Sequence, residues 1–268
     1  VASKTNVTRG VPRIEEILRL TKNPKNPSLT VYLNDYDAQD QDRAMKYANM
    51  IEYTQLQDVV QNVQIFYDPT DEHSVIEEDH EMLQHYFEYE TLVKQFTQTD
   101  FTEDSAKSKW ITRIELNADV MLEKNIRMDD IYFAINNSYK EKVSCIYSDY
   151  NSNKLIFRIR MYKQKDSKKD KVEGSTPIDA ADEIYILKNF QENLLKKIIL
   201  RGVGGISKVL PRKVPNSVVK EDGKFVRRDT WVLDTTGTNL LDVLSLDFID
   251  NIKTYSNDIQ EVYNVLGI

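Results

Sequence analysis

The chain has 268 residues, of which 40% are hydrophobic and 29% charged, a composition typical of a folded protein and not of a disordered one. Its 43 acidic and 36 basic residues give a net charge of −7, which argues against a module that grips nucleic acid over its whole surface. The single cysteine, Cys145, excludes an internal disulfide and a cysteine-based zinc site. No apolar run reaches the roughly 20 residues of a membrane-spanning helix, and no signal-peptide pattern stands at Val1. We therefore expect neither a membrane protein nor a secreted one.

The first part of the chain alternates helices and strands. Proline fits the first turn of a helix, and apolar residues at helical spacing predict a helix from about Pro12 to Leu20. A strand is expected at Ser28–Leu33, after a stretch punctuated by prolines and asparagines. A second helix at Asp40–Ile51 has acidic residues near its positive end, and a second strand is expected at Asn62–Tyr67.

The middle of the chain predicts a strand, a helix and a hairpin. Trp110–Leu116 is the expected strand, and Asn117 is placed to cap the element after it. Met128–Tyr139 shows an apolar stripe at helical spacing. Lys142–Tyr147 and Lys154–Tyr162 then form two strands joined by a turn-rich stretch.

Two arginines alternate with apolar residues in the second strand of this hairpin. Arg158 and Arg160 stand between residues such as Phe157 and Ile159, so one face is expected to be buried and the other to meet solvent or a partner. The following residues, about 163–176, are almost entirely polar and charged and are expected to form a mobile loop.

The last third predicts a long helix, short strands and two short helices. The long helix covers about Ile178–Ile198, and the two short helices cover Leu240–Leu246 and Asp258–Leu266. Asp222–Gly223 is a strong hairpin turn. The short strands are expected at Ile206–Leu210, Ser217–Lys220, Lys224–Arg227 and Thr230–Asp234. The fold class is α+β, with antiparallel sheets and packed helices.

Three motifs imitate functional sites without matching them. "HEMLQH" at His80–His85 is one residue longer than the zinc-protease motif, which sets the two imidazoles about 140° apart around a helix. "DYDAQDQD" at Asp35–Asp42 lacks the glycine and the distal glutamate of an EF-hand and fits a solvated helix start. "RGVGGI" at Arg201–Ile206 lacks the continuation of a phosphate-binding loop and fits a tight turn. The sequence predicts no self-sufficient active site.

Several long blocks point to one protein family. They are, in chain order, "VASKTNVTRGVPRIEEILRLTKNPKNPSLTVYL", "IFYDPTDEHSVIEED", "WITRIEL", "KLIFRIRM", "IILRGVGGISKV" and "WVLDTTGTNLLDVLSLDFIDNIKTYSNDIQEVYNVLGI". Together they resemble the largest subunit of multisubunit DNA-directed RNA polymerases of the RNA polymerase II type. The resemblance spans essentially the whole chain, and its first and last blocks are the most specific.

The resemblance implies that the chain is one part of a larger multisubunit assembly. Residues 1–52 match the returning arm of the trigger loop and a cleft segment, residues 53–206 the jaw, and residues 207–268 the C-terminal cleft segment. The family's nucleotide-contacting histidine and metal-binding aspartates match positions upstream of Val1. We therefore expect no catalytic residue, metal site or cofactor in this chain, and we expect the whole enzyme to hold Mg2+ elsewhere.

Two groups of residues are candidates for function. The trigger-loop arm comprises Arg9, Gly10, Val11, Pro12 and Arg13, with Gly10 as a hinge and Pro12 as the restart of the helix. A helix of about nine residues is marginal by itself, as expected for an element that folds and unfolds. Candidate contacts to DNA or partners are Arg158, Arg160, Lys163, Lys165, Lys168 and Lys169. The alternative for both groups is that they are ordinary solvated surface residues. For the second group, the net negative charge of the chain favours this alternative.

The resemblance also implies partners and a location. The partners are the second-largest subunit, smaller polymerase subunits, downstream double-stranded DNA, a transcript-cleavage factor, and a small zinc-ribbon subunit that adds a strand to the hairpin edge. The expected location is the nucleus. Abundant Asn, Lys, Ile, Tyr and Asp with 8 Gly suggest an AT-rich genome, which fits a large DNA virus or an AT-rich eukaryote such as a protist. For a virus, the alternative location is the virion or host cytoplasm.

A free-standing interaction module is the rival hypothesis. It predicts a well-folded monomer, whereas a piece of a larger subunit predicts exposed apolar surface on the first and last helices.

Overall fold

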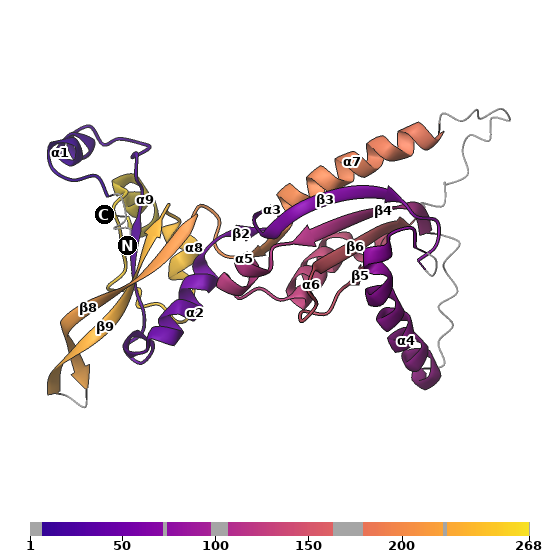
Figure 1. The fold of residues 1–268 in the computed structure, drawn as a ribbon. Helices are drawn as coiled ribbons and strands as arrows, with labels where there is room; N and C mark the ends of the chain where they lie inside the picture. Colours follow the sequence, from indigo (N-terminus) through magenta and orange to yellow (C-terminus); the bar gives the residue numbers. More distant parts are fainter. Residues whose placement is uncertain (1–6, 72–73, 98–106, 163–178, 222–223, 268) are drawn as a thin grey trace. The chain divides into compact units, whose positions relative to one another are not determined.

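The computed structural model describes residues 7–71, 74–97, 107–162, 179–221 and 224–267 (Figure 1). The chain forms two compact units, one made of Val1–Thr54 with Arg201–Ile268 and the other of Gln55–Leu200. The second unit lies inside the range 53–206 that the resemblance implies for the jaw. The polar loop expected at about 163–176 lies outside the described residues. No helix in the described ranges is both long and apolar enough to cross a bilayer.

The first unit is built on a four-stranded antiparallel sheet with strand order β10-β1-β9-β8. Its strands are β1 (Leu29–Tyr32), β8 (Lys208–Glu221), β9 (Lys224–Thr236) and β10 (Tyr255–Ser256). Its helices are α1 (Val11–Leu18), the 3-10 turn η1 (Asp37–Gln39), α2 (Gln41–Ile51), α8 (Leu240–Leu244) and α9 (Ile259–Leu266).

The core of this unit lies between the sheet and its helices. Val31 of β1 stands opposite Leu233 of β9, and both side chains are fully buried. Helix α2 begins where the Asp40 side chain accepts a hydrogen bond from the Asp42 backbone N–H, as the acidic helix start predicted. The helix buries three residues at helical spacing against the same core, Ala44, Ala48 and Ile51.

A tight turn at Arg201–Ile206 packs against the end of α2. Gly202 has a φ of 101°, and a Cβ on it would lie 2.1 Å from the carbonyl oxygen of Glu52. The N–H of Val203 donates to the carbonyl of Ile51 at 3.0 Å. Glycine is therefore required by both conformation and close approach, so "RGVGGI" is a backbone turn.

The second unit is built on a four-stranded antiparallel sheet with strand order β3-β4-β6-β5. Its strands are β3 (Val60–Tyr67), β4 (Lys107–Leu116), β5 (Val143–Tyr147) and β6 (Leu155–Tyr162). Its helices are α3 (Leu56–Val59), α4 (His80–Thr97), α5 (Ala118–Glu123), α6 (Met128–Tyr139) and α7 (Asp179–Lys197), with 3-10 turns η2 (Glu77–Asp79) and η4 (Lys140–Lys142). The short strands β2 (Thr54–Gln55) and β7 (Ile199–Arg201) lie where the chain passes between the units.

One face of this second sheet carries an apolar core with α6 and α7. Phe157 is fully buried in it, and Tyr147 stacks on the Phe157 ring with centroids 5.4 Å apart. Ile131 and Ile135 of α6 and Leu194 of α7 complete the centre of the cluster. The apolar stripes of both helices therefore face the strand positions that alternate with Arg158 and Arg160.

The predicted elements are confirmed where local patterns are strong. Helix α6 has the predicted bounds, and Asn117 caps α5 by accepting from the N–H groups of Asp119 and Val120. The fold class is α+β with antiparallel sheets, as predicted.

Two expectations about elements were wrong or incomplete. The 18-residue helix α4 was not predicted. Four short strands were expected in the region of the second hairpin, but β8 and β9 are two long strands that pair in one antiparallel ladder, with a register shift between Val214 and Ser217. Long-range pairing overrides the local breaks that prolines introduce. The turn Asp222–Gly223 lies outside the described residues.

Candidate functional site

Three arginines lie together on one face of the sheet in the second unit, opposite the face that carries the apolar core. Arg158 and Arg160 are two residues apart on β6 and therefore point to the same face. Arg113 on β4 stands directly opposite Arg158 in the antiparallel register. Like charges at such spacing repel one another, so the arrangement requires nearby carboxylates.

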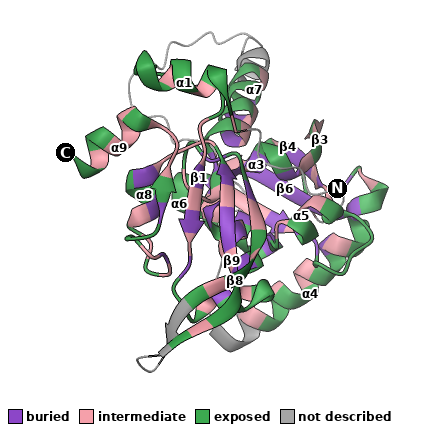
Figure 2. Cartoon of the chain, turned by 90° about the vertical axis from the view of Figure 1, so that its left-hand side faces the viewer, coloured by how far each residue is buried: buried purple, intermediate pink, exposed green. Residues whose placement is uncertain are grey.

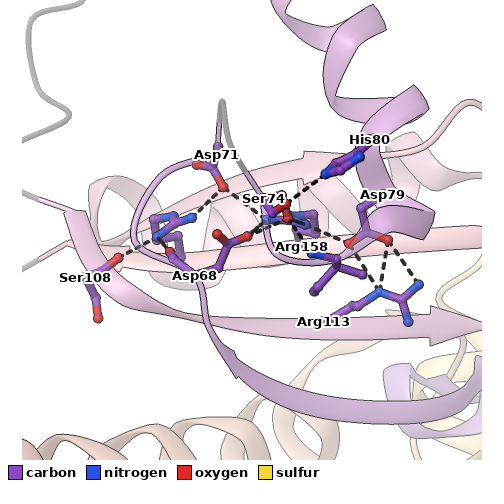
Figure 3. Close-up of polar contacts among 10 residues, drawn as sticks. Asp68, Asp71, Ser74, Asp79, His80, Ser108, Arg113 and Arg158 are labelled. Carbon is purple, nitrogen blue, oxygen red and sulfur yellow. Dashed lines mark hydrogen bonds and ion pairs between the residues drawn. The ribbon is translucent and has the colours of Figure 1, made fainter.

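The segment between β3 and α4 supplies these carboxylates (Figure 3). Arg158 donates from Nη2 to Asp68 Oδ2 and from Nη1 to Asp79 Oδ2, each at 2.7 Å. It also donates from Nη1 to the Ser74 hydroxyl at 3.2 Å. Arg113 Nε lies 3.1 Å from Asp79 Oδ1, so Asp79 joins two strands.

Arg160 holds the beginning of the same segment. Its Nη1 donates to the carbonyl oxygens of Asp68 at 2.7 Å and Ser108 at 2.8 Å, and its Nη2 pairs with Asp71. The segment is thus fixed through both backbone and side-chain acceptors. We call Asp68, Asp71, Asp79, Arg113, Arg158 and Arg160 the arginine network.

The arginine network is almost free of solvent. Asp68 and Asp79 are completely buried, and Arg158 is 2% exposed. Burial opposes the charge of Arg158, but hydrogen bonds to Asp68 and Asp79 outweigh it and keep its pKa above the ordinary value. Removing one buried charged side chain would leave its oppositely charged partner buried without an ion pair, which is costly. The network therefore fixes where the segment and the start of α4 lie.

The expected exposure of Arg158 and Arg160 was wrong. Both side chains are buried, and their donors are directed at groups of the same unit. The other four basic candidates, Lys163, Lys165, Lys168 and Lys169, lie outside the described residues. The network was detectable in principle, because residues 68–79 contain six acidic residues and an arginine face needs matching charge.

The histidine motif has a structural role. His80 Nε2 lies 2.7 Å from the carbonyl oxygen of Ser74, whereas His85 lies on the exposed surface beside Glu88. In the described part of the chain, no three or more His, Cys, Asp or Glu residues are grouped to hold a metal ion.

The arm formed by Arg9–Arg13 is exposed and weakly attached to its unit. Gly10 precedes α1 with a φ of 73°, and no side chain caps the helix. Arg13 pairs with Glu16 at 3.0 Å and donates to the carbonyl oxygen of Asn257. The helix begins at Val11, one residue before the predicted start.

The first and last helices, α1 and α9, are coloured as exposed or intermediate in Figure 2. Neither α1 nor α9 contains a buried residue. On α1, Val11 is 69% and Leu18 77% exposed, and on α9 Leu266 is 62% exposed. Exposed apolar helix faces favour a piece of a larger assembly over a free-standing module.

The comparison with protein families identifies a family for this chain. The model described as RNA polymerase Rpb1, domain 7 matches residues 54–201, which is more than half of the chain. The matched range contains the whole of the second unit and therefore the arginine network.

Proposed function

We infer the function of this chain from its family. The chain is a member of the RNA polymerase Rpb1 family, and its match covers domain 7 of that family. It is thus part of the largest subunit of a multisubunit DNA-directed RNA polymerase, which as a whole is a nucleotidyltransferase and associates with other polymerase subunits. The observation that carries the proposal is the match across the whole second unit. The polymerase II type is proposed from the resemblance of the sequence blocks.

The first element of the proposal is that Arg9–Arg13 and α1 form the returning arm of the trigger loop. Such an arm must fold and open in each nucleotide-addition cycle. An eight-residue helix with no buried residue loses little packing when it moves, and Gly10 adopts a backbone conformation that favours glycine. Closure of the arm would exclude water from the catalytic centre elsewhere in the enzyme.

The second element is that residues 53–206 form the jaw and guide downstream double-stranded DNA. The arginine network would stiffen this part, and the Lys163–Lys169 cluster remains the candidate for phosphate contacts. Strand β5 is an edge strand of its sheet, and a strand from a small zinc-ribbon subunit would pair with it there. A transcript-cleavage factor would dock at the same part, and residues 207–268 would return to the cleft.

Magnesium would be held outside this chain. The buried acidic residues Asp68 and Asp79 do not fit as ligands, because arginine guanidinium groups donate to Asp68 Oδ2 and to both carboxylate oxygens of Asp79, and no third acidic or histidine ligand of the described residues joins them. The chain contributes positioning and docking, and the catalytic aspartates and trigger-loop histidine would lie in the rest of the largest subunit. The location would be the nucleus, or the virion and host cytoplasm for a viral enzyme.

Co-purification tests the proposal most directly. The complete largest subunit containing this chain should co-purify with the second-largest subunit and elongate RNA on a DNA template. Deletion of residues 55–200 should remove jaw-dependent contacts to downstream DNA. A chain that stays monodisperse and binds no polymerase subunit would instead support the free-standing module.

A further inference from the structure

The β8–β9 hairpin extends beyond the part of its sheet that pairs with β1 and packs in the core. Strand β1 pairs with β9 only from Val232 to Asp234, and the buried hairpin residues Val209 and Leu233 lie at that end. The ladder nevertheless continues to Glu221 opposite Lys224. Figure 1 shows the paired strands as an arm of their unit. We call residues 217–221 and 224–228 the distal hairpin.

A bulge separates the distal hairpin from the packed part, to which Arg228 at the hairpin's base is joined by a hydrogen bond from Nη1 to the Gln39 side chain at 2.9 Å. The register shifts between Val214 and Ser217, and Asn216 has a φ of 56°. The N–H of Asn216 donates to Asp229 Oδ1 at 3.2 Å, and Lys213 Nζ pairs with Asp229 Oδ2 at 2.9 Å. A bulge bends and twists a strand, so these contacts set the direction of the distal hairpin.

Strand β8 is an edge strand that resists pairing with another chain. Pro211 and Pro215 lack a backbone N–H, and the bulge interrupts the row of hydrogen-bonding groups. On the β8 side, we therefore expect a partner to engage the hairpin through its side chains.

Those side chains combine apolar and basic character. Phe225 is 77% and Val218 63% exposed, although both belong to residue types that are usually buried. Arg227 is exposed, lies directly opposite Val218, and shares a strand face with Phe225. Residues 217–228 contain four basic and two acidic residues in a chain with a net charge of −7.

We propose, resting on the proposed function, that the distal hairpin docks on another protein subunit of the polymerase, with Phe225 and Val218 in an apolar groove and Arg227 at its acidic rim. Exposed aromatic and arginine side chains are typical anchors of protein interfaces. Nucleic-acid interfaces are more polar and more strongly positive, which fits a surface centred on Phe225 and Val218 less well. The basic excess of the hairpin selects an acidic partner surface.

Site-specific photocrosslinking tests this inference. The photoreactive residue p-benzoylphenylalanine replaces Phe225 in the complete largest subunit, which is assembled with the other purified subunits on a DNA template. Irradiation should link the largest subunit to another protein subunit. In the same enzyme, Val218→Ser should lower the yield about tenfold, whereas Val218→Ile should preserve it.

The outcomes separate the two proposals. An enzyme that assembles but forms no protein link, or links to DNA, overturns the docking inference and leaves the proposed function intact. A subunit that fails to assemble even with Phe225 retained overturns the proposed function and this inference with it.

Discussion

Arg158 on β6 and Asp79 of η2, directly before α4, form an ion pair whose side chains are 2% and 0% exposed. Nη1 and Oδ2 are 2.7 Å apart, and the two residues are 79 positions apart in the chain. The pair joins the sheet to the 3-10 turn η2, which leads directly into α4. Its loss should affect how α4 is held more than whether the sheet forms.

Replacing Arg158 with Met should destabilise the second unit by about 3–5 kcal/mol, because Asp68 stays buried without its ion-pair partner. Urea unfolding followed by hydrogen exchange of β6 and α4 measures this. Lys154→Ala is the matched control, because Lys154 pairs with Glu78 at 3.1 Å on the surface and its loss should change stability little. Equal effects of the two variants would contradict the structural role of the network.

Gly202→Ala should destabilise the first unit by about 2 kcal/mol or more. The residue has a φ of 101°, and the added Cβ would collide with the backbone of Glu52 and Tyr53. Gly204→Ala is the control in the same turn, because a Cβ there meets no atom within 4 Å. Thermal unfolding of both variants should lower Tm for Gly202→Ala alone.

Gly10→Val should slow RNA elongation by the assembled polymerase if Gly10 is the hinge of the trigger-loop arm. No atom lies within 4 Å of a Cβ at this position, so the substitution tests backbone conformation without a clash. A β-branched residue at a φ of 73° costs about 1–3 kcal/mol. Gly10→Ala should give a smaller decrease, and unchanged single-nucleotide addition rates in both variants would rule out the hinge.

Cys145 should resist alkylation in the folded chain. Burial raises the pKa of its thiol to about 12, and because the thiolate is the reactive form, iodoacetamide should label it readily only after unfolding. Comparing labelling at pH 8.5 with and without urea by mass spectrometry checks this. Equal rates in both states would contradict the burial.

The same pKa shift predicts alkaline destabilisation. Because the folded pKa is raised from an ordinary 9.0 to about 12, the contribution to the free energy of unfolding is complete below about pH 9 and is lost as the pH rises towards 12. Tyr147, whose pKa burial and the Asp129 hydrogen bond also raise to about 12, acts in the same direction. Cys145→Ala should therefore reduce the slope of the free energy of unfolding against pH. The part of the slope that Tyr147 contributes should remain.

The sequence by itself determined the elements whose signals are local. Met128–Tyr139 carries an apolar stripe at helical spacing, Asn117 offers a cap at the required position, and the alternation at Leu155–Tyr162 identifies a strand with one buried apolar face. These signals depend on residues that are close together in the sequence, so a short stretch of sequence is enough to recognise each of them.

Only the tertiary structure decided what covers the other face of that strand. Alternation shows that Arg158 and Arg160 share a face, but it does not distinguish water from carboxylates about 80 to 90 residues away in the chain. The joining of β8 and β9 into one ladder also depends on pairing across the sheet, which outweighs the local breaks at Pro211 and Pro215. The burial of a charge and the pairing of two strands each depend on two segments that are distant in the sequence. The local sequence around one segment does not show which other segment will contact it.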